Sequence, residues 1–350
     1  MNCFKVIICL VLISNSLNFP QLKNNFRIKI ISVTNIFQEG TYEACHASTI
    51  VELTWGIFMA AWFAGSYEGA NDVGIWGSTF SGNNWSEPFE LVKGNDSLGN
   101  RLPCWNPVLF KTKTNRLILF YKVGINPREW WGNMIQSYDN GKSWSQPQKL
   151  PEGFLGPIKN KPIELDDGSI LCPSSVESLD GNWSVHLEIT NNNLTKWKKV
   201  NIDKDSSVGA IQPTIIRYPE GKLQMLCRSR QDRIFETWSF DNGLHWSRLK
   251  ATSLPNPNSG IDAVTLDNGN FILVYNPLSK GAEWFNGRNI LNVAISKDGK
   301  NWKDIYQLEN EREGEFSYPA VIQAEDKAVH ITYTARRKTI KHIILKINEE

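Results

Sequence analysis

Short runs of hydrophobic residues, separated by turn-forming residues, follow one another along most of the chain. The first group comprises STIVEL at 48–53, GIFMAAWF at 56–63 and DVGIW at 72–76. Runs of this length, rich in β-branched and aromatic residues, predict β-strands. Little of the sequence has the 3.6-residue period of an amphipathic helix, so the pattern predicts an all-β protein.

The group of three runs recurs, and each group is followed by a Trp-ending turn and a fourth run. A second group lies at 106–110, 116–123 and 133–137, and a third at 161–165, 168–175 and 184–189. Fourth runs include EPFELV at 87–92 and QPQKL at 146–150. The repeat therefore predicts a succession of four-stranded units, and no low-complexity linker divides them.

The turn before the fourth run carries its own motif. SYDNGKSW at 137–144 and SFDNGLHW at 239–246 share Ser, Asp, Gly and Trp at identical spacing. Degenerate copies lie at 78–85, 190–197 and 296–302, and the terminal Trp residues are 59, 53, 49 and 56 residues apart. Repeats of about this length are typical of propeller blades. Ser and Asp can accept backbone N–H groups, Gly supplies a positive φ angle and Trp packs between sheets, so we interpret the motif as scaffold.

This motif is the Asp-box, or BNR repeat, and the chain resembles the sialidase (neuraminidase) superfamily of six-bladed β-propellers over about residues 44–347. The resemblance implies an all-β, six-bladed propeller at 44–350, preceded by a lead-in segment at 17–43. It also implies that residues 318–345 belong to a sixth blade without an Asp-box.

The first 16 residues, MNCFKVIICLVLISNS, have the layout of a secretory signal peptide: one Lys, an apolar run and small polar residues. The alternative is a buried first strand. We expect a secreted protein or one of the secretory lumen, and four Asn-x-Ser/Thr sequons at Asn84, Asn95, Asn182 and Asn193 are compatible with this. No later stretch approaches the roughly 18 apolar residues of a membrane span.

Charge and cysteine content narrow the possible partners. The net charge of +2 gives no general attraction to nucleic acid, whereas 14 Trp residues favour repeated packing units, a sugar-binding surface, or both. Cys45, Cys104, Cys172 and Cys227 lack zinc-site spacing, so we expect neither a metal nor a cofactor. They could pair across neighbouring repeats, but buried free thiols are favoured.

The resemblance implies particular site residues. Sialidases clamp a sugar carboxylate with three arginines, use a Glu-activated Tyr as nucleophile and take a proton donor from a loop of the first blade. Matching segments give Arg228 and Arg288 as clamp residues, Tyr318 as the nucleophile, and Glu68 or Asp72 as the acid.

Two positions depart from the family pattern. His46 stands where the first clamp arginine is expected, and Gln212 stands where the activating Glu is expected. An amide cannot take a proton from Tyr318. We therefore expect little cleavage of ordinary sialosides.

Other polar segments can contribute to a pocket. They supply Lys122, Arg128 and Trp130 in the second repeat, Lys159 in the third and Asp262 in the fifth. A basic, Trp-lined surface suits an anionic carbohydrate. The sequence thus supports two hypotheses: an exo-acting glycoside hydrolase on an acidic or substituted sugar of a glycan, or a carbohydrate-binding propeller without catalysis.

Overall fold

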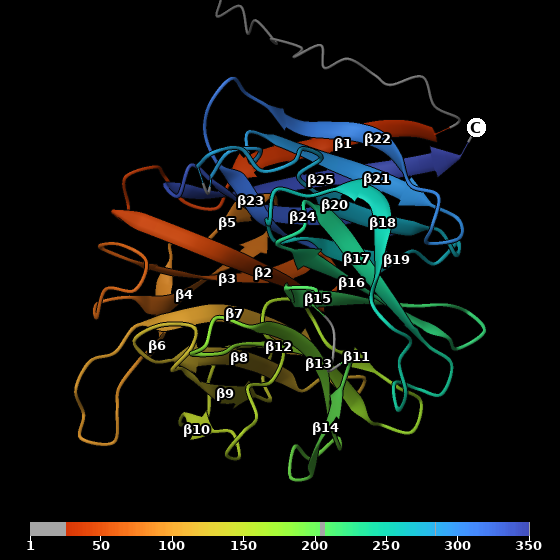
Figure 1. The fold of residues 1–350 in the computed structure, drawn as a ribbon. Helices are drawn as coiled ribbons and strands as arrows, with labels where there is room; N and C mark the ends of the chain where they lie inside the picture. The colour runs from red at the N-terminus through yellow and green to blue at the C-terminus, as the bar shows by residue number, and fades with distance from the viewer. Residues whose placement is uncertain (1–25, 204–206, 284, 350) are drawn as a thin grey trace, which may run out of the picture.

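Six antiparallel sheets succeed one another along the chain and around the molecule (Figure 1). The computed structural model describes residues 26–203, 207–283 and 285–349, and these residues contain no helix. The innermost strands lie next to one another around a common axis: β2 contacts β7 and β23, and β19 contacts β15 and β23. The prediction of an all-β, six-bladed propeller is confirmed. The predicted signal peptide at 1–16 lies outside the described residues.

The strands divide among the blades as follows. Blade 1 contains β2 (Ala44–Thr54), β3 (Ile57–Gly65), β4 (Gly74–Ser81), β5 (Asn84–Trp85) and β6 (Phe89–Lys93). Blade 2 contains β7 (Cys104–Lys111), β8 (Leu117–Val123), β9 (Trp131–Ser137) and β10 (Gln148–Lys149). Blade 3 contains β11 (Ile163–Glu164), β12 (Ile170–Glu177), β13 (Trp183–Thr190) and β14 (Trp197–Asn201). Blade 4 contains β15 (Ala210–Arg217), β16 (Leu223–Ser229), β17 (Arg233–Ser239) and β18 (Lys250–Pro255). Blade 5 contains β19 (Asp262–Thr265), β20 (Phe271–Tyr275), β21 (Ile290–Ser296) and β22 (Lys303–Asn310). Blade 6 contains β23 (Phe316–Gln323), β24 (Val329–Ala335), β25 (Thr339–Glu349) and β1 (Phe26–Asn35).

The first strand completes the last blade. β1 pairs antiparallel with β25, from Phe26 opposite Glu349 to Asn35 opposite Lys341. Its side chains alternate between half-buried and exposed, as expected for a strand with one covered face. Part of the segment that sequence analysis treats as a lead-in to the propeller is thus an outer strand of blade 6.

The Asp-box turns have the hydrogen bonds expected of scaffold. In blade 2, Ser137 Oγ accepts the backbone N–H of Gly141 at 2.8 Å, and Asp139 Oδ1 accepts that of Ser143 at 2.9 Å. Gly141 has a φ angle of 83°, and Trp144 packs against a core cluster drawn mainly from blades 1 and 2. Blade 4 repeats the arrangement around Ser239, Asp241 and Trp246. The motif therefore fixes the turn between two strands, and its Trp side chain packs against the apolar residues between neighbouring blades.

Apolar side chains fill the spaces between blades. One cluster joins Met59 and Phe63 of β3 to Leu119 and Tyr121 of β8, all almost completely buried. The cysteines at 45, 104, 172 and 227 are buried and free, as the sequence favours. Among the described residues no helix is long and apolar enough to cross a membrane.

Candidate functional site

Four of the innermost strands carry a β-bulge at the same level of the propeller. The pairing register shifts in β2, β7, β15 and β23. Residues with a positive φ angle at these bulges are Ala47, Asn106, Gln212 and Tyr318, with values of 57°, 38°, 51° and 53°. Such angles are uncommon outside glycine, and bulges redirect side chains. Strained backbone at equivalent places in four blades indicates a site at the axis.

Tyr318 lies at the centre of this site. Its hydroxyl group accepts hydrogen bonds from Arg228 Nη1 at 2.7 Å and from Gln212 Nε2 at 3.2 Å. Arg228 Nη1 also donates to Gln212 Oε1 at 3.1 Å, and Arg228 Nε donates to Asn258 Oδ1 at 3.0 Å. Two residues of blade 4 therefore meet at the phenolic oxygen of a residue from blade 6, and Asn258, in the loop before blade 5, holds the guanidinium group of Arg228.

The ring of Tyr318 is held from several sides. The ring centroids of Tyr318 and His46 are 4.1 Å apart, and Lys159 Nζ lies 5.8 Å from the centroid of the Tyr318 ring. A Cβ atom at Gly260 would lie 3.2 Å from the same ring, so glycine permits the close approach of this loop. The phenol is consequently fixed in one orientation.

His46 is a neutral residue in a cationic environment. It is only 1% exposed, and its Nδ1 lies 3.0 Å from Thr334 Oγ1. Burial lowers the pKa of His46 well below its ordinary value, and four nearby cations lower it further. These cations are Arg337, Arg288, Arg228 and Lys159. The Nε2 atom of the ring is buried and has no hydrogen-bond partner among the described residues.

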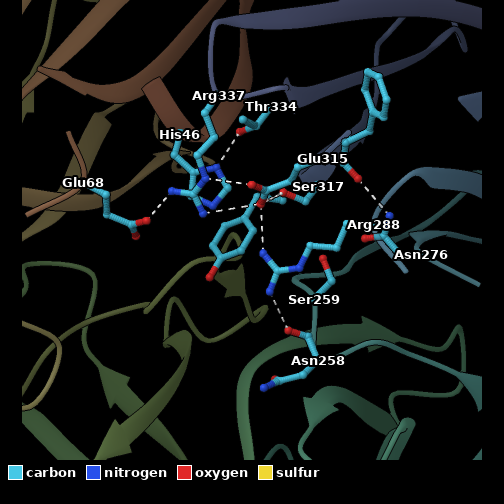
Figure 2. A network of polar contacts seen from close by, with 12 residues as sticks. His46, Glu68, Asn258, Ser259, Asn276, Arg288, Glu315, Ser317, Thr334 and Arg337 are labelled. Atoms are coloured by element: carbon cyan, nitrogen blue, oxygen red, sulfur yellow. Dashed lines mark hydrogen bonds and ion pairs between the residues drawn. The ribbon is translucent and has the colours of Figure 1, made fainter. Parts of the chain in front are cut away.

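A chain of ion pairs joins Arg288, one of the two arginines expected to bind the sugar carboxylate, to blade 1 (Figure 2). Arg288 Nη1 donates to Glu315 Oε1 at 2.9 Å, and Arg337 Nε donates to Glu315 Oε2 at 2.8 Å. Arg337 Nη1 continues the chain to the carboxylate of Glu68. Burial alone would raise the pKa of Glu315, yet Arg337 and Arg288 outweigh burial and hold that pKa below its ordinary value.

Arg337 is the main residue that sequence reasoning missed. It lies in the turn between β24 and β25, in the segment ARRK, and reaches the neighbourhood of His46. The site therefore contains three guanidinium groups, from Arg228, Arg288 and Arg337, although the position expected for the first one holds His46. We call the three arginines and His46, together with Tyr318, Gln212, Glu315 and Glu68, the axial site.

The two proposed acids are placed differently. Glu68 reaches the axial site through Arg337, with a side chain 39% exposed. Asp72 instead accepts hydrogen bonds from the backbone N–H of Ser66 at 3.0 Å and from Ser66 Oγ at 2.6 Å. Asp72 thus braces its own loop, and the structure brings only Glu68 to the charged network.

Three residues that sequence analysis assigns to the pocket surface are buried instead. Lys122 is 0% exposed and donates to the carbonyl group of Pro157, while burial lowers its pKa to about 7. Lys159 donates to the carbonyl groups of Ile261 and Pro319, and burial lowers its pKa to about 7 as well. Asp262 accepts Lys161 Nζ at 2.8 Å, Thr214 Oγ1 at 2.9 Å and the N–H of Val321 at 2.9 Å. These side chains link blades, and Lys159 does so directly against Tyr318.

A further carboxyl group lies on the blade 3 side. Glu177, at the end of β12, is half-buried and hydrogen bonds with Trp183. Burial raises the pKa of Glu177, and Arg228, Arg230 and Arg128 only partly offset this. The sequence signal for Glu177 is weak, because an acidic residue before a turn is ordinary. Arg128 and Trp130 line a separate groove between blades 2 and 3.

Comparisons with known proteins agree with this architecture. The family model described as a BNR repeat-like domain matches residues 56–331. No curated protein matches the chain.

Solved structures of similar fold include sialidases. A protein of unknown function from Dyadobacter fermentans superposes with a TM-score of 0.75 at 16% identity, covering 92% of this chain and 99% of that one. The NanB sialidase of Streptococcus pneumoniae gives 0.68 at 14% identity, covering 94% and 71%. The Trypanosoma rangeli sialidase gives 0.72 at 15% identity, covering 92% and 60%. At such identities the likeness establishes the fold.

Proposed function

Because this chain belongs to the BNR repeat-like domain family and has the six-bladed fold of sialidases, we propose that its axial site binds a terminal acidic sugar of a glycan and hydrolyses its glycosidic bond. The proposal rests above all on one observation. Arg228, Arg288 and Arg337 converge around Tyr318 and His46. Guanidinium groups bind carboxylates with paired hydrogen bonds, so this cluster suits a sugar that carries an anionic group.

The remaining residues can divide the work of hydrolysis. Cleavage of a glycosidic bond generally uses two groups that handle protons or stabilise the developing charge. Glu68 is the acid expected at the blade 1 side, and Glu177, whose pKa is raised, suits proton donation nearer neutral pH. Tyr318, whose hydroxyl group accepts a hydrogen bond from Arg228, would lie near the anomeric carbon of the bound sugar.

The second candidate function is carbohydrate binding without turnover, and the environment of Tyr318 favours it. The phenolic oxygen is held by Arg228 and by the amide of Gln212, and neither group can accept its proton. A Tyr nucleophile would therefore lack an activating base, which also argues against efficient cleavage of ordinary α-sialosides.

A substrate screen separates these functions. The full chain is assayed with aryl glycosides of sialic, uronic and neutral sugars, and the corresponding free sugars are tested by calorimetry. We expect binding of an acidic sugar in preference to its neutral counterpart, with turnover of an acidic aryl glycoside if the site is catalytic. Equal binding of acidic and neutral sugars would contradict the role of the three arginines.

We also infer that the protein acts in the secretory pathway or outside the cell. The N-terminal signal-peptide pattern supports this location, and all four sequon asparagines are exposed on the propeller: Asn84, Asn95, Asn182 and Asn193. Expression in a eukaryotic host followed by enzymatic deglycosylation tests the inference. A mass unchanged by deglycosylation would count against it.

A further inference from the structure

A groove of about 320 Å³ lies between blades 2 and 3, outside the axial site. Its apolar lining includes Trp130, Trp131 and Phe154, and three cations border it: Arg128, Lys149 and Lys199. Glu152 is the acidic residue among the lining side chains. The groove therefore combines aromatic surface with an excess of positive charge, and its volume is at the lower end of the range for small-molecule sites.

Two of the three cations lie over aromatic rings of the groove. Lys149 Nζ lies 4.9 Å from the centroid of the Trp131 ring, and Lys199 Nζ lies 5.7 Å from that of Phe154. Cation–π contacts of this kind hold ammonium groups beside apolar surface. A sugar ring packed on such a surface would place its substituents within reach of those ammonium groups, and a carboxylate substituent would be favoured.

Packing and electrostatic contacts link side chains of the groove to the axial site. The rings of Trp130 and Trp105 meet edge to face with centroids 5.9 Å apart, and Trp105 packs against Gly69, the neighbour of Glu68. On the other side, Arg128 and Arg228 both act electrostatically on the carboxyl group of Glu177. In the proposed complex, a glycan whose terminal sugar occupies the axial site would extend along these side chains toward the groove.

We propose that this groove is a second subsite, which binds an inner carboxylate-bearing sugar of the same acidic oligosaccharide. The inference rests on the proposed function for its first subsite, and it adds that the preferred binding partner is an oligomer carrying acid groups on more than one residue. A neutral chain would gain apolar contact in the groove but not the contribution of the three cations.

The test is chain-length dependence measured by calorimetry on the full protein. Galacturonic acid and its dimer, trimer and tetramer are titrated, with maltotetraose as a neutral oligomer. We expect the affinity to rise at least tenfold from the monomer to the trimer. In the double variant Arg128→Gln/Lys149→Gln the trimer should bind within about threefold of the monomer, whereas monomer binding should not change.

A matched control removes the same number of positive charges at positions outside the groove. The double variant Lys142→Gln/Lys196→Gln removes two exposed lysines from Asp-box turns and should retain the full length dependence. Trp130→Ala should abolish the dependence of affinity on chain length. Trp55→Ala removes an indole from a residue that is 66% exposed, in the turn between β2 and β3, and should retain that dependence.

The outcomes separate the two proposals. Equal affinity for monomer and trimer in the wild type would overturn the second subsite while leaving the axial site intact. Trimer binding that depends on Arg128 and Lys149, with no monomer binding and no effect of Arg228→Met, would support the groove and contradict the proposed function. Equal loss of monomer and trimer binding in the groove variant would also overturn the second subsite.

Discussion

Arg228 Nη1 donates a hydrogen bond of 2.7 Å to the hydroxyl oxygen of Tyr318. The two residues come from blades 4 and 6, so the bond joins two blades that are not neighbours along the chain. It places a permanent cation on a phenol that has no basic partner. In the proposed complex, the same cation would bind an anionic group of the sugar.

Replacing Arg228 with Met should weaken binding of an acidic sugar by about 1.5 to 3 kcal/mol, the scale of a hydrogen bond to a charged group. Binding of the neutral counterpart should change little, because its hydroxyl groups do not need the charge. Calorimetric titration of galacturonic acid and galactose measures both. Equal losses for the two sugars would show that Arg228 shapes the pocket without selecting charge.

Hydrolysis of any acidic aryl glycoside should depend on Glu68 more strongly than on Tyr318. Glu68→Gln removes a carboxyl group at the axial site, whereas Tyr318→Phe removes a hydroxyl group that no base activates. Asp72→Asn serves as the comparison, because Asp72 only braces its loop. The measurement is kcat for each variant. Robust cleavage of an aryl sialoside that disappears only in Tyr318→Phe would reverse this assignment.

Stability should fall between pH 6.5 and pH 4 because of two buried histidines. His330 Nδ1 and His342 Nε2 lie 3.0 Å apart, and burial lowers their pKa values to about 4 and about 3. Below pH 6.5 the unfolded chain binds protons that the folded chain does not, so the free energy of unfolding decreases as the pH falls. His330 alone should account for about 3 kcal/mol once the pH has passed 4.

Urea denaturation at pH 7, 6, 5 and 4 measures this dependence. The double variant His330→Asn/His342→Asn should be less stable at pH 7 but should lose much less stability over the same interval. An unchanged pH dependence in the double variant would assign the acid sensitivity to other groups.

Truncating an Asp-box indole should destabilise the fold without altering the chemistry of the axial site. Trp246→Ala removes a half-buried ring that packs on the core cluster of blades 3 and 4 and should cost about 3 kcal/mol. The exposed Trp55 provides the control, since Trp55→Ala should cost far less. Thermal unfolding and sugar titration are measured together. Lost binding with an unchanged melting temperature would show that the Asp-box contributes to the site.

The sequence predicts the blades well because each blade repeats the same local signals. The spacing of Trp144 and Trp246 and the turn chemistry around them depend only on neighbouring residues, so the repeat is readable without a structure. The family resemblance identifies Tyr318, Gln212 and Arg228, and the structure brings them together at the hydroxyl oxygen of Tyr318.

What the sequence does not reveal depends on contacts between distant segments. Arg337 enters the axial site only because its turn faces blade 1, and nothing local distinguishes it from the exposed Arg336 beside it. Lys122 and Lys159 look like surface cations, but backbone carbonyl groups of other segments accept hydrogen bonds from them and allow their burial. Acceptors of this kind cannot be identified from the residues around a lysine.

The pairing of β1 with β25 has a consequence for the charged centre of the molecule. A chain that began at Ala44 would leave β25 as an open edge, with unpaired backbone groups ready to recruit a strand from another copy. Arg337 lies two residues before β25, and its guanidinium group joins Glu68 to Glu315. By pairing with β25, the first strand therefore stabilises the strand that follows Arg337 and helps to fix the position of its guanidinium group.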